Sequence, residues 1–227
     1  MRGFSLTSSA RHLLVRSKLA RRAAFRARWA STRRVAPLTR YGFERGKPID
    51  RWFIERFLHD HASAVRGTVL EVKEDLYASA LGAQRVDVLD IDPHNPLATL
   101  VGDLCEATTL EEDRYDVAII TQTLQLVADP VAALVHLRRS LRPGGLLLVT
   151  VPCMSRLAGG GRDRWRWTPK GFREVAAAAG FTGEVEGVGN VLTCRSFLFG
   201  AAVEDFDVTL LQLNDPDCPL LITAILR

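Results

Sequence analysis

Residues 115–151 constrain the fold more than any other part of this 227-residue chain. Residues 115–121 form an apolar, β-branched run without alternation, which is typical of a strand buried on both faces of a parallel sheet. Asp129 and Pro130 then stand where a helix cap and a first helical residue belong, and a Pro-Gly-Gly sequence ends the amphipathic stretch. A second apolar run follows at 146–151. The pattern predicts a strand–helix–strand unit with a right-handed crossover.

Shorter apolar runs extend this unit in both directions. Runs at 67–72, 85–92 and 98–101 predict three strands before it, and a strand-like pattern from Gly183 and a last run at 219–226 predict two after it. Further helices are predicted at 45–64, which opens near Pro48, and from the Thr168-Pro169 cap to Ala179. Alternating strands and helices of this kind predict an α/β fold.

The charge of the chain is divided unevenly. Residues 1–40 contain ten arginines, one lysine and no acidic residue, whereas the remainder has 19 basic and 26 acidic residues. We interpret 1–40 as a solvated basic head and 41–227 as the folded domain, with its core at 66–227. An amphipathic helix, a transit-peptide-like segment and a peripheral membrane tether are the alternatives for the head. The acidic body predicts no nucleic-acid partner.

The cysteines and the apolar runs indicate the compartment. The four cysteines, at 105, 153, 194 and 218, form no CxxC pair and no metal-ligand spacing, so we expect reduced structural thiols and no metal site. No apolar run approaches the ~20 residues of a membrane-spanning helix. These features predict a cytoplasmic protein.

Several motifs resemble those of one enzyme superfamily. The Tyr115-Asp116 strand start, the acidic helix cap and the LRPGG sequence at 141–145 resemble strands four and five of class I S-adenosylmethionine-dependent methyltransferases, of the type 11 kind. The sequence at 165–169, WRWTP, is similar to the WRFTP motif of such enzymes. The segment at 46–57 resembles one in bacterial methyltransferases found with glycosyltransferases. The resemblance implies a doubly wound, mostly parallel, Rossmann-like sheet of seven strands with an antiparallel last strand, and S-adenosylmethionine as cofactor.

The resemblance also assigns residues after the first predicted strand. Glu71 matches an acidic residue that precedes a Gly-x-Gly-x-Gly loop in the family. Lys73 stands where the first glycine is expected, so the glycine loop is degenerate. We expect the lysine to be tolerated if its side chain points away from the ligand and its backbone keeps a negative φ. Its ammonium would then be able to meet the cofactor's carboxylate.

Acidic residues at the ends of the next strands complete the expected cofactor site. Asp92 lies 21 residues after Glu71, near the spacing of a ribose-binding acid, although it would also suit a cap of the Asp-Pro turn. Asp90, two residues earlier, is the second choice. By resemblance, Asp103 would accept the adenine amino group and Leu104 would pack on the ring. Gln122 would contact the cofactor from the loop after the fourth strand.

The acceptor side is less defined. Trp165 and Arg166 would line an acceptor site, since aromatic and cationic groups suit sugars or acidic substrates, although the tryptophan would also suit simple packing. Asp163 and His94 are open choices for a base, and no catalytic residue is assigned. The expected function is methyl transfer to a small-molecule or glycan acceptor. A non-catalytic methyltransferase-like scaffold, for which Lys73 is the motive, is the alternative.

Overall fold

The computed structural model describes residues 20, 22–23, 36–158 and 161–227. The predictions for the basic head fall mainly on residues 1–19, 21 and 24–35, which lie outside the described residues. In the part that is described, no helix is both long and apolar enough to cross a membrane.

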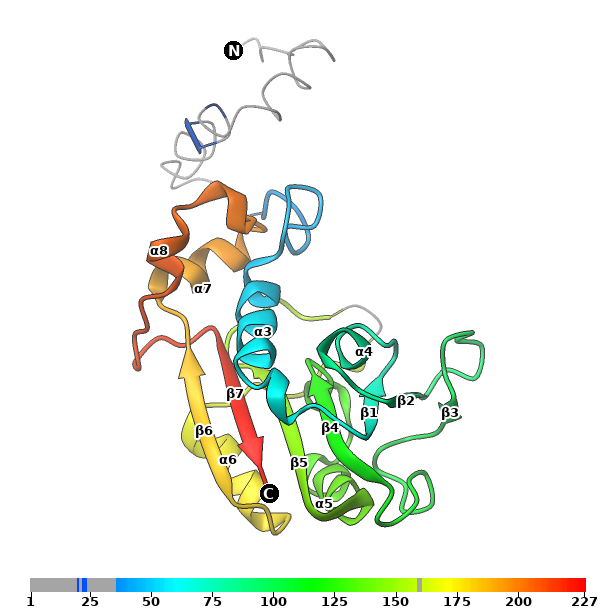
Figure 1. Cartoon of the computed structure of the whole chain (residues 1–227). Helices are drawn as coiled ribbons and strands as arrows, with labels where there is room; N and C mark the ends of the chain where they lie inside the picture. The colour runs from blue at the N-terminus through cyan, green and yellow to red at the C-terminus, as the bar shows by residue number, and fades with distance from the viewer. Residues whose placement is uncertain (1–19, 21, 24–35, 159–160) are drawn as a thin grey trace.

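Seven strands form one sheet in the order β3-β2-β1-β4-β5-β7-β6 (Figure 1). β7 runs antiparallel to both of its neighbours, and the pairs among β1 to β5 are parallel. The predicted fold class is therefore confirmed. The strands are β1 Thr68–Val72, β2 Arg85–Asp90, β3 Leu100–Val101, β4 Tyr115–Thr121, β5 Leu141–Pro152, β6 Gly183–Val188 and β7 Leu221–Leu226.

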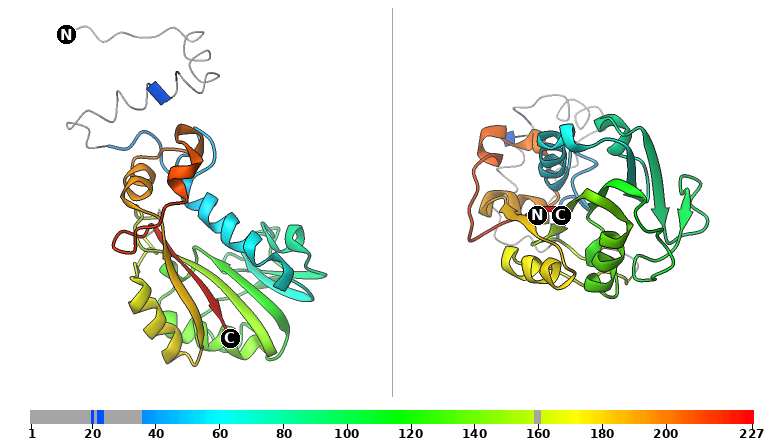
Figure 2. Two further views of the ribbon diagram at one scale, coloured as in Figure 1. Left: turned by 60° about the vertical axis from the view of Figure 1, so that its left-hand side comes forward. Right: turned by 60° about the horizontal axis from the view of Figure 1, so that its bottom comes forward.

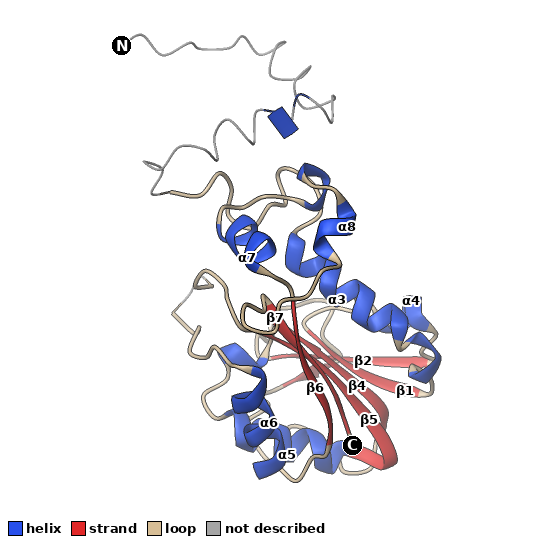
Figure 3. Ribbon diagram, turned by 90° about the vertical axis from the view of Figure 1, so that its left-hand side faces the viewer, coloured by secondary structure: helices blue, strands red, loops and turns tan. Residues whose placement is uncertain are grey.

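Helices cover both faces of the sheet (Figures 2 and 3). The α-helices of the described body are α3 Ile49–Asp60, α4 Ala78–Leu81, α5 Pro130–Ser140, α6 Pro169–Ala178, α7 Val191–Leu198 and α8 Val208–Leu211. One face carries α5 and α6, and the other carries α3, α4 and α7. In the central strand β4, Ala118 and Ile120 point into the first layer, while Val117 and Ile119 point into the second. This explains why β4 shows no polar–apolar alternation in the sequence.

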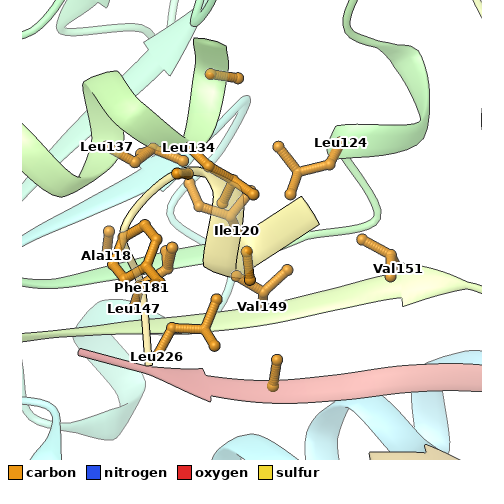
Figure 4. Close-up of a cluster of buried hydrophobic side chains, with 14 of the residues drawn as sticks. Ala118, Ile120, Leu124, Leu134, Leu137, Leu147, Val149, Val151, Phe181 and Leu226 are labelled. Carbon is orange, nitrogen blue, oxygen red and sulfur yellow. The ribbon is translucent and has the colours of Figure 1, made fainter. Parts of the chain in front are cut away.

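The core under α5 consists of side chains without exposed surface. Leu134 and Leu137 of α5 pack on Ile120 of β4 and Leu147 of β5, and all four are fully buried (Figure 4). Full burial of a leucine or isoleucine side chain contributes about 1.5–3 kcal/mol. This packing holds the central strands in place, and their carboxyl ends form the site described below.

The helix caps agree with the sequence prediction. Asp129 accepts hydrogen bonds from Val131 N and Ala132 N, both at 3.0 Å, and Pro130 is the first residue of α5. Thr168 caps α6 in the same way through Gly171 N. Side-chain oxygens at these positions satisfy backbone N–H groups that have no partner within the helix.

Several boundaries differ from the prediction, among them that of α3, which was predicted at 45–64 and spans Ile49–Asp60. The segment from Val191 is helix α7 instead of strand, because Asn190 and Thr193 form a reciprocal capping box. The Pro-Gly-Gly sequence does not end α5, which stops at Ser140; it lies in a bulge of β5, where Gly144 has φ +80°. β2 ends at Asp90, two residues earlier than predicted.

The described residues place part of the predicted head on the body. Leu38 N donates to Phe199 O at 2.7 Å, and Thr39 Oγ1 donates to Gly200 O at 2.7 Å. Leu38 also packs against the hydrophobic cluster under α3. Residues 36–40 therefore pack on the folded domain, although the charge pattern had grouped them with the head.

Candidate functional site

A cavity of about 690 Å³ opens at the carboxyl edge of the sheet. Its walls come from the ends of β1, β2 and β4, the loop after β3, the first turn of α3 and the segment that follows β5. The volume falls within the range of small-molecule sites. The topology explains its position, because ligands of doubly wound sheets bind outside the carboxyl ends of the strands where the strand order reverses.

Glu71 near the end of β1 organises the following loop, which lines the cavity. Its buried carboxylate accepts hydrogen bonds from the backbone N–H groups of Leu76, Tyr77 and Ala78 at 2.9–3.2 Å. Burial raises the pKa of Glu71 above its ordinary value, and the three N–H groups oppose that rise. Glu71 thus ties the loop to the start of α4 and lines the cavity.

Lys73 has a backbone conformation that glycine would favour. Its φ is +76°, so the expectation of a negative φ is wrong. The conformation is held by Lys73 N, which donates to Leu89 O at 2.8 Å, and by Asn95 Nδ2, which donates to Lys73 O at 2.6 Å. The side chain is exposed at the cavity wall. The loop therefore follows a glycine-like path despite the lysine.

The structure separates the two aspartates after β2. Asp90 lines the cavity, and its Oδ2 accepts from Asn95 Nδ2 at 2.7 Å. Asp92 is exposed, does not line the cavity, and accepts from His94 N at 3.0 Å in the turn. Of the two, the second choice, Asp90, therefore lines the cavity and the first choice, Asp92, does not, because β2 ends two residues before the predicted end. His94 also lies outside the cavity wall.

The loop after β3 contributes the pair that the resemblance suggested. Asp103 and Leu104 both line the cavity. Oδ1 of Asp103 accepts from Cys105 N at 2.9 Å, and Leu104 is buried. Gly102, which precedes this pair, donates its N–H to Asp90 O at 2.9 Å. This hydrogen bond places Asp103 and Leu104 near Asp90.

Two glutamines after β4 bring polar atoms without partners to the cavity wall. Gln122 has φ +47°, a second strained conformation at this edge. Its Nε2 and the Oε1 of Gln125 are buried and have no hydrogen-bond partner among the described residues. Gln125 Nε2 donates to Gln122 O at 2.6 Å. Buried polar atoms are rarely left unpaired, so a donor and an acceptor are available for a polar ligand.

The predicted acceptor residues differ in their positions. Arg166 lines the cavity, but its guanidinium is paired with Asp163 at 2.5 Å. This hydrogen bond holds the pKa of Asp163 below its ordinary value, which makes Asp163 a poor base. Trp165 is not part of the cavity wall; its Nε1 donates to Val127 O at 2.9 Å and fastens the segment to the loop after β4.

Sequence reasoning missed the contribution of α3. Asp50 and Arg51, in its first turn, line the cavity together with Tyr77. Burial raises the pKa of Asp50 to about 6 and that of Tyr77 to about 12. The Tyr77 hydroxyl is therefore neutral, and it accepts a hydrogen bond from Arg51 Nη1 at 3.1 Å. No local motif in the helix marks these residues, since a charged first turn is ordinary.

Comparisons with known proteins agree with this architecture. Residues 57–149 match the model of the type 11 family, described as a methyltransferase domain. No curated protein matches the chain. An S-adenosylmethionine-dependent methyltransferase from Mesorhizobium loti is 16% identical with a TM-score of 0.54, over 79% of this chain and 97% of that one.

Two other solved structures are similar. The DhpI–SAH complex is 17% identical with a TM-score of 0.52, over 95% of this chain and 97% of that one. A chain of the complex between the Haloferax volcanii Trm112 methyltransferase activator and a methyltransferase is 20% identical with a TM-score of 0.53, over 78% and 92%. The family match over 57–149 agrees with the resemblance to class I S-adenosylmethionine-dependent methyltransferases, and the solved structures share the fold.

Proposed function

We propose that this protein binds S-adenosylmethionine in the cavity at the carboxyl edge and transfers its methyl group to a small-molecule or glycan acceptor. The observation that carries the proposal is the set of polar groups at the strand ends. Asp90 comes from the end of β2, Asp103 from the loop after β3 and Gln122 from the loop after β4, yet all three line one cavity. Such convergence of a few polar groups in an apolar setting is typical of a ligand site.

Each group has a role that its chemistry supports. The carboxylate of Asp90 would accept hydrogen bonds from the ribose hydroxyls. Asp103 would accept from the adenine amino group, and Leu104 would pack on the ring. Gln122 Nε2 and Gln125 Oε1 have no hydrogen-bond partner in the part of the chain that the structure describes, so they fit a polar ligand. When bound, the sulfonium supplies an activated methyl group, and the protein's main task is to align it with the acceptor.

The alternative function is a methyltransferase-like scaffold that binds no cofactor. This alternative was suggested by Lys73, which replaces the first glycine of the loop. However, Lys73 has a positive φ, which is the backbone conformation that a glycine would adopt there. Strained backbone conformations persist where surrounding contacts hold them, and they cluster at functional sites. Lys73 and Gln122 both follow this pattern, which favours the enzyme. Peripheral membrane contact through the basic head remains a prediction.

Calorimetric titration with S-adenosylhomocysteine tests the proposal. We expect binding in the micromolar range, and Asp90→Asn should weaken it about 10- to 100-fold, since a hydrogen bond to a charged group contributes about 1.5–3 kcal/mol. Asp92→Asn is the matched control, because Asp92 lies in the same turn but outside the cavity; its affinity should stay within about twofold. Absence of binding at millimolar ligand would favour the scaffold.

A further inference from the structure

The first turn of α3 presents two opposite charges to the cavity. Asp50 and Arg51 are adjacent, and both line the wall. The carboxylate of Asp50 accepts a hydrogen bond from Arg51 N at 2.8 Å, and among the described residues it forms no ion pair with a side chain. The Asp50 carboxylate is half-buried, and the adjacent Arg51 charge offsets only part of its desolvation, so it is suited to a cationic ligand group.

Arg51 forms no salt bridge among the residues that the structure places, although its charge acts on the adjacent Asp50 carboxylate. Its Nη1 donates to the neutral hydroxyl of Tyr77, and its guanidinium carbon lies 6.0 Å from the ring of Phe43 and 5.8 Å from that of Tyr77. These rings orient the guanidinium beside the cavity. A guanidinium held in this way is well suited to a carboxylate, which it can bind through two N–H groups.

The turn lies beside the loop that replaces the glycine-rich sequence. Tyr77, which contacts Arg51, donates its backbone N–H to Glu71 at 3.2 Å. Three backbone N–H groups already occupy the Glu71 carboxylate. Glu71 is therefore less available to a ligand than Asp50, and α3 supplies a carboxylate and a guanidinium next to the end of β1.

We propose that Asp50 and Arg51 together recognise a zwitterionic α-amino-acid head group, that of the methionyl end of the cofactor. Asp50 pairs with the ammonium, and Arg51 pairs with the carboxylate. The proposal rests on the proposed function, because it places the cofactor in this cavity. In this proposal, α3 binds the head group in place of the glycine loop. Cofactor binding is then compatible with the loss of the glycines. An amino-acid acceptor would carry the same head group, and the experiment separates the two sources.

The test compares two ligands that differ only in this head group region. S-Adenosylhomocysteine carries the amino-acid group, whereas 5′-methylthioadenosine keeps the nucleoside and the thioether without it. Asp50→Asn and Arg51→Gln should each weaken S-adenosylhomocysteine about 10- to 100-fold by calorimetry. Both should leave 5′-methylthioadenosine within about twofold, which also shows that the variants are folded. Asp60→Asn and Arg56→Gln, an exposed pair on the same helix, are the matched controls.

Proton release gives a second readout. Asp50, with a pKa of about 6, is about half protonated at pH 6, and pairing with an ammonium favours its charged form. Wild-type protein should release about half a proton per S-adenosylhomocysteine, measured by calorimetry at pH 6 in MES and in Bis-Tris. Other titratable or charged groups also line the cavity: Tyr41, Arg51, Glu71, Lys73, Glu74, Tyr77, Asp90, Asp103, Arg156, Arg162, Asp163, Arg164 and Arg166. The pKa of Glu71 is also raised, so Glu71 could release protons as well. The protons released by Asp50 are therefore measured as the difference between wild type and Asp50→Asn.

The outcomes distinguish this inference from the proposed function. If wild-type protein binds neither ligand, the proposed function fails. If wild-type protein binds S-adenosylhomocysteine and both variants keep the wild-type affinity, the inference is overturned while the function stands, and an amino-acid acceptor becomes the candidate occupant. Equal losses for both ligands would also overturn it. A loss confined to S-adenosylhomocysteine, with the proton release abolished in Asp50→Asn, would support it.

Discussion

Replacing Asp50 by asparagine should stabilise the folded protein at neutral pH. Burial raises the pKa of Asp50 from 3.8 to about 6, so the folded state binds this proton more tightly than the unfolded state does. The free energy of unfolding of the wild-type protein therefore falls as the pH rises from about 4 to about 6, and it does not recover this loss at higher pH. A change of this size in pKa corresponds to about 3 kcal/mol.

Asparagine keeps the shape of the side chain and removes the charge. Because the new amide also needs hydrogen-bond partners, we expect a gain of about 1–3 kcal/mol in the free energy of unfolding at about pH 7.5. The gain should shrink toward zero at about pH 4, where aspartate in the wild type is largely protonated in the folded state. A stabilising substitution that weakens ligand binding is the pattern expected of a functional residue.

Urea denaturation of wild type and Asp50→Asn at both pH values measures the effect. Asp60→Asn is the control, because Asp60 is exposed on the same helix and should change stability by less than about 0.5 kcal/mol. Two results would refute the reasoning: a lower stability of Asp50→Asn at about pH 7.5, or an advantage that is equally large at about pH 4.

Three further substitutions test the described structure by thermal or urea denaturation. Lys73→Gly should raise the free energy of unfolding by up to about 1 kcal/mol, since glycine accepts φ +76° without strain; a clear loss would contradict the positive φ. Arg45→Ala should cost about 3–5 kcal/mol because it removes the ion pair of the fully buried Asp205 carboxylate, whereas Arg56→Ala, in an exposed pair, should cost under about 1 kcal/mol. Asp129→Ala should cost about 0.5–2 kcal/mol through loss of the α5 cap, and an unchanged stability would argue against that cap.

Local signals in the sequence were enough for much of the fold. The apolar run of β4 and the Asp129-Pro130 cap of α5 were predicted at their observed positions. Both depend only on nearby residues: a strand buried on two faces needs a continuous apolar run, and a helix start needs a side-chain acceptor. Where two local signals competed, the prediction was wrong, as at Asn190, where a capping box prevailed over β-branched residues.

The aspartates after β2 show where local signals stop being sufficient. Asp90 and Asp92 are two residues apart, so they share one face of an extended strand and the alternation pattern cannot separate them. Only the pairing of β2 with β3, which ends at Asp90 opposite Val101, shows where the strand stops and the turn begins. The spacing from Glu71 was close enough to suit either residue.

By itself the sequence determined the strand–helix–strand centre, the helix caps and the acidic residues near the strand ends, because these features are encoded within a few neighbouring positions. Only the tertiary structure decided that Asp50 and Arg51 belong to the cavity. They lie about twenty residues before Glu71, and the contact of Arg51 with Tyr77 brings the start of α3 to the end of β1. A charged first turn looks the same in a surface helix as in a binding site. Its environment depends on which other elements pack beside it, and that arrangement is a property of the folded chain.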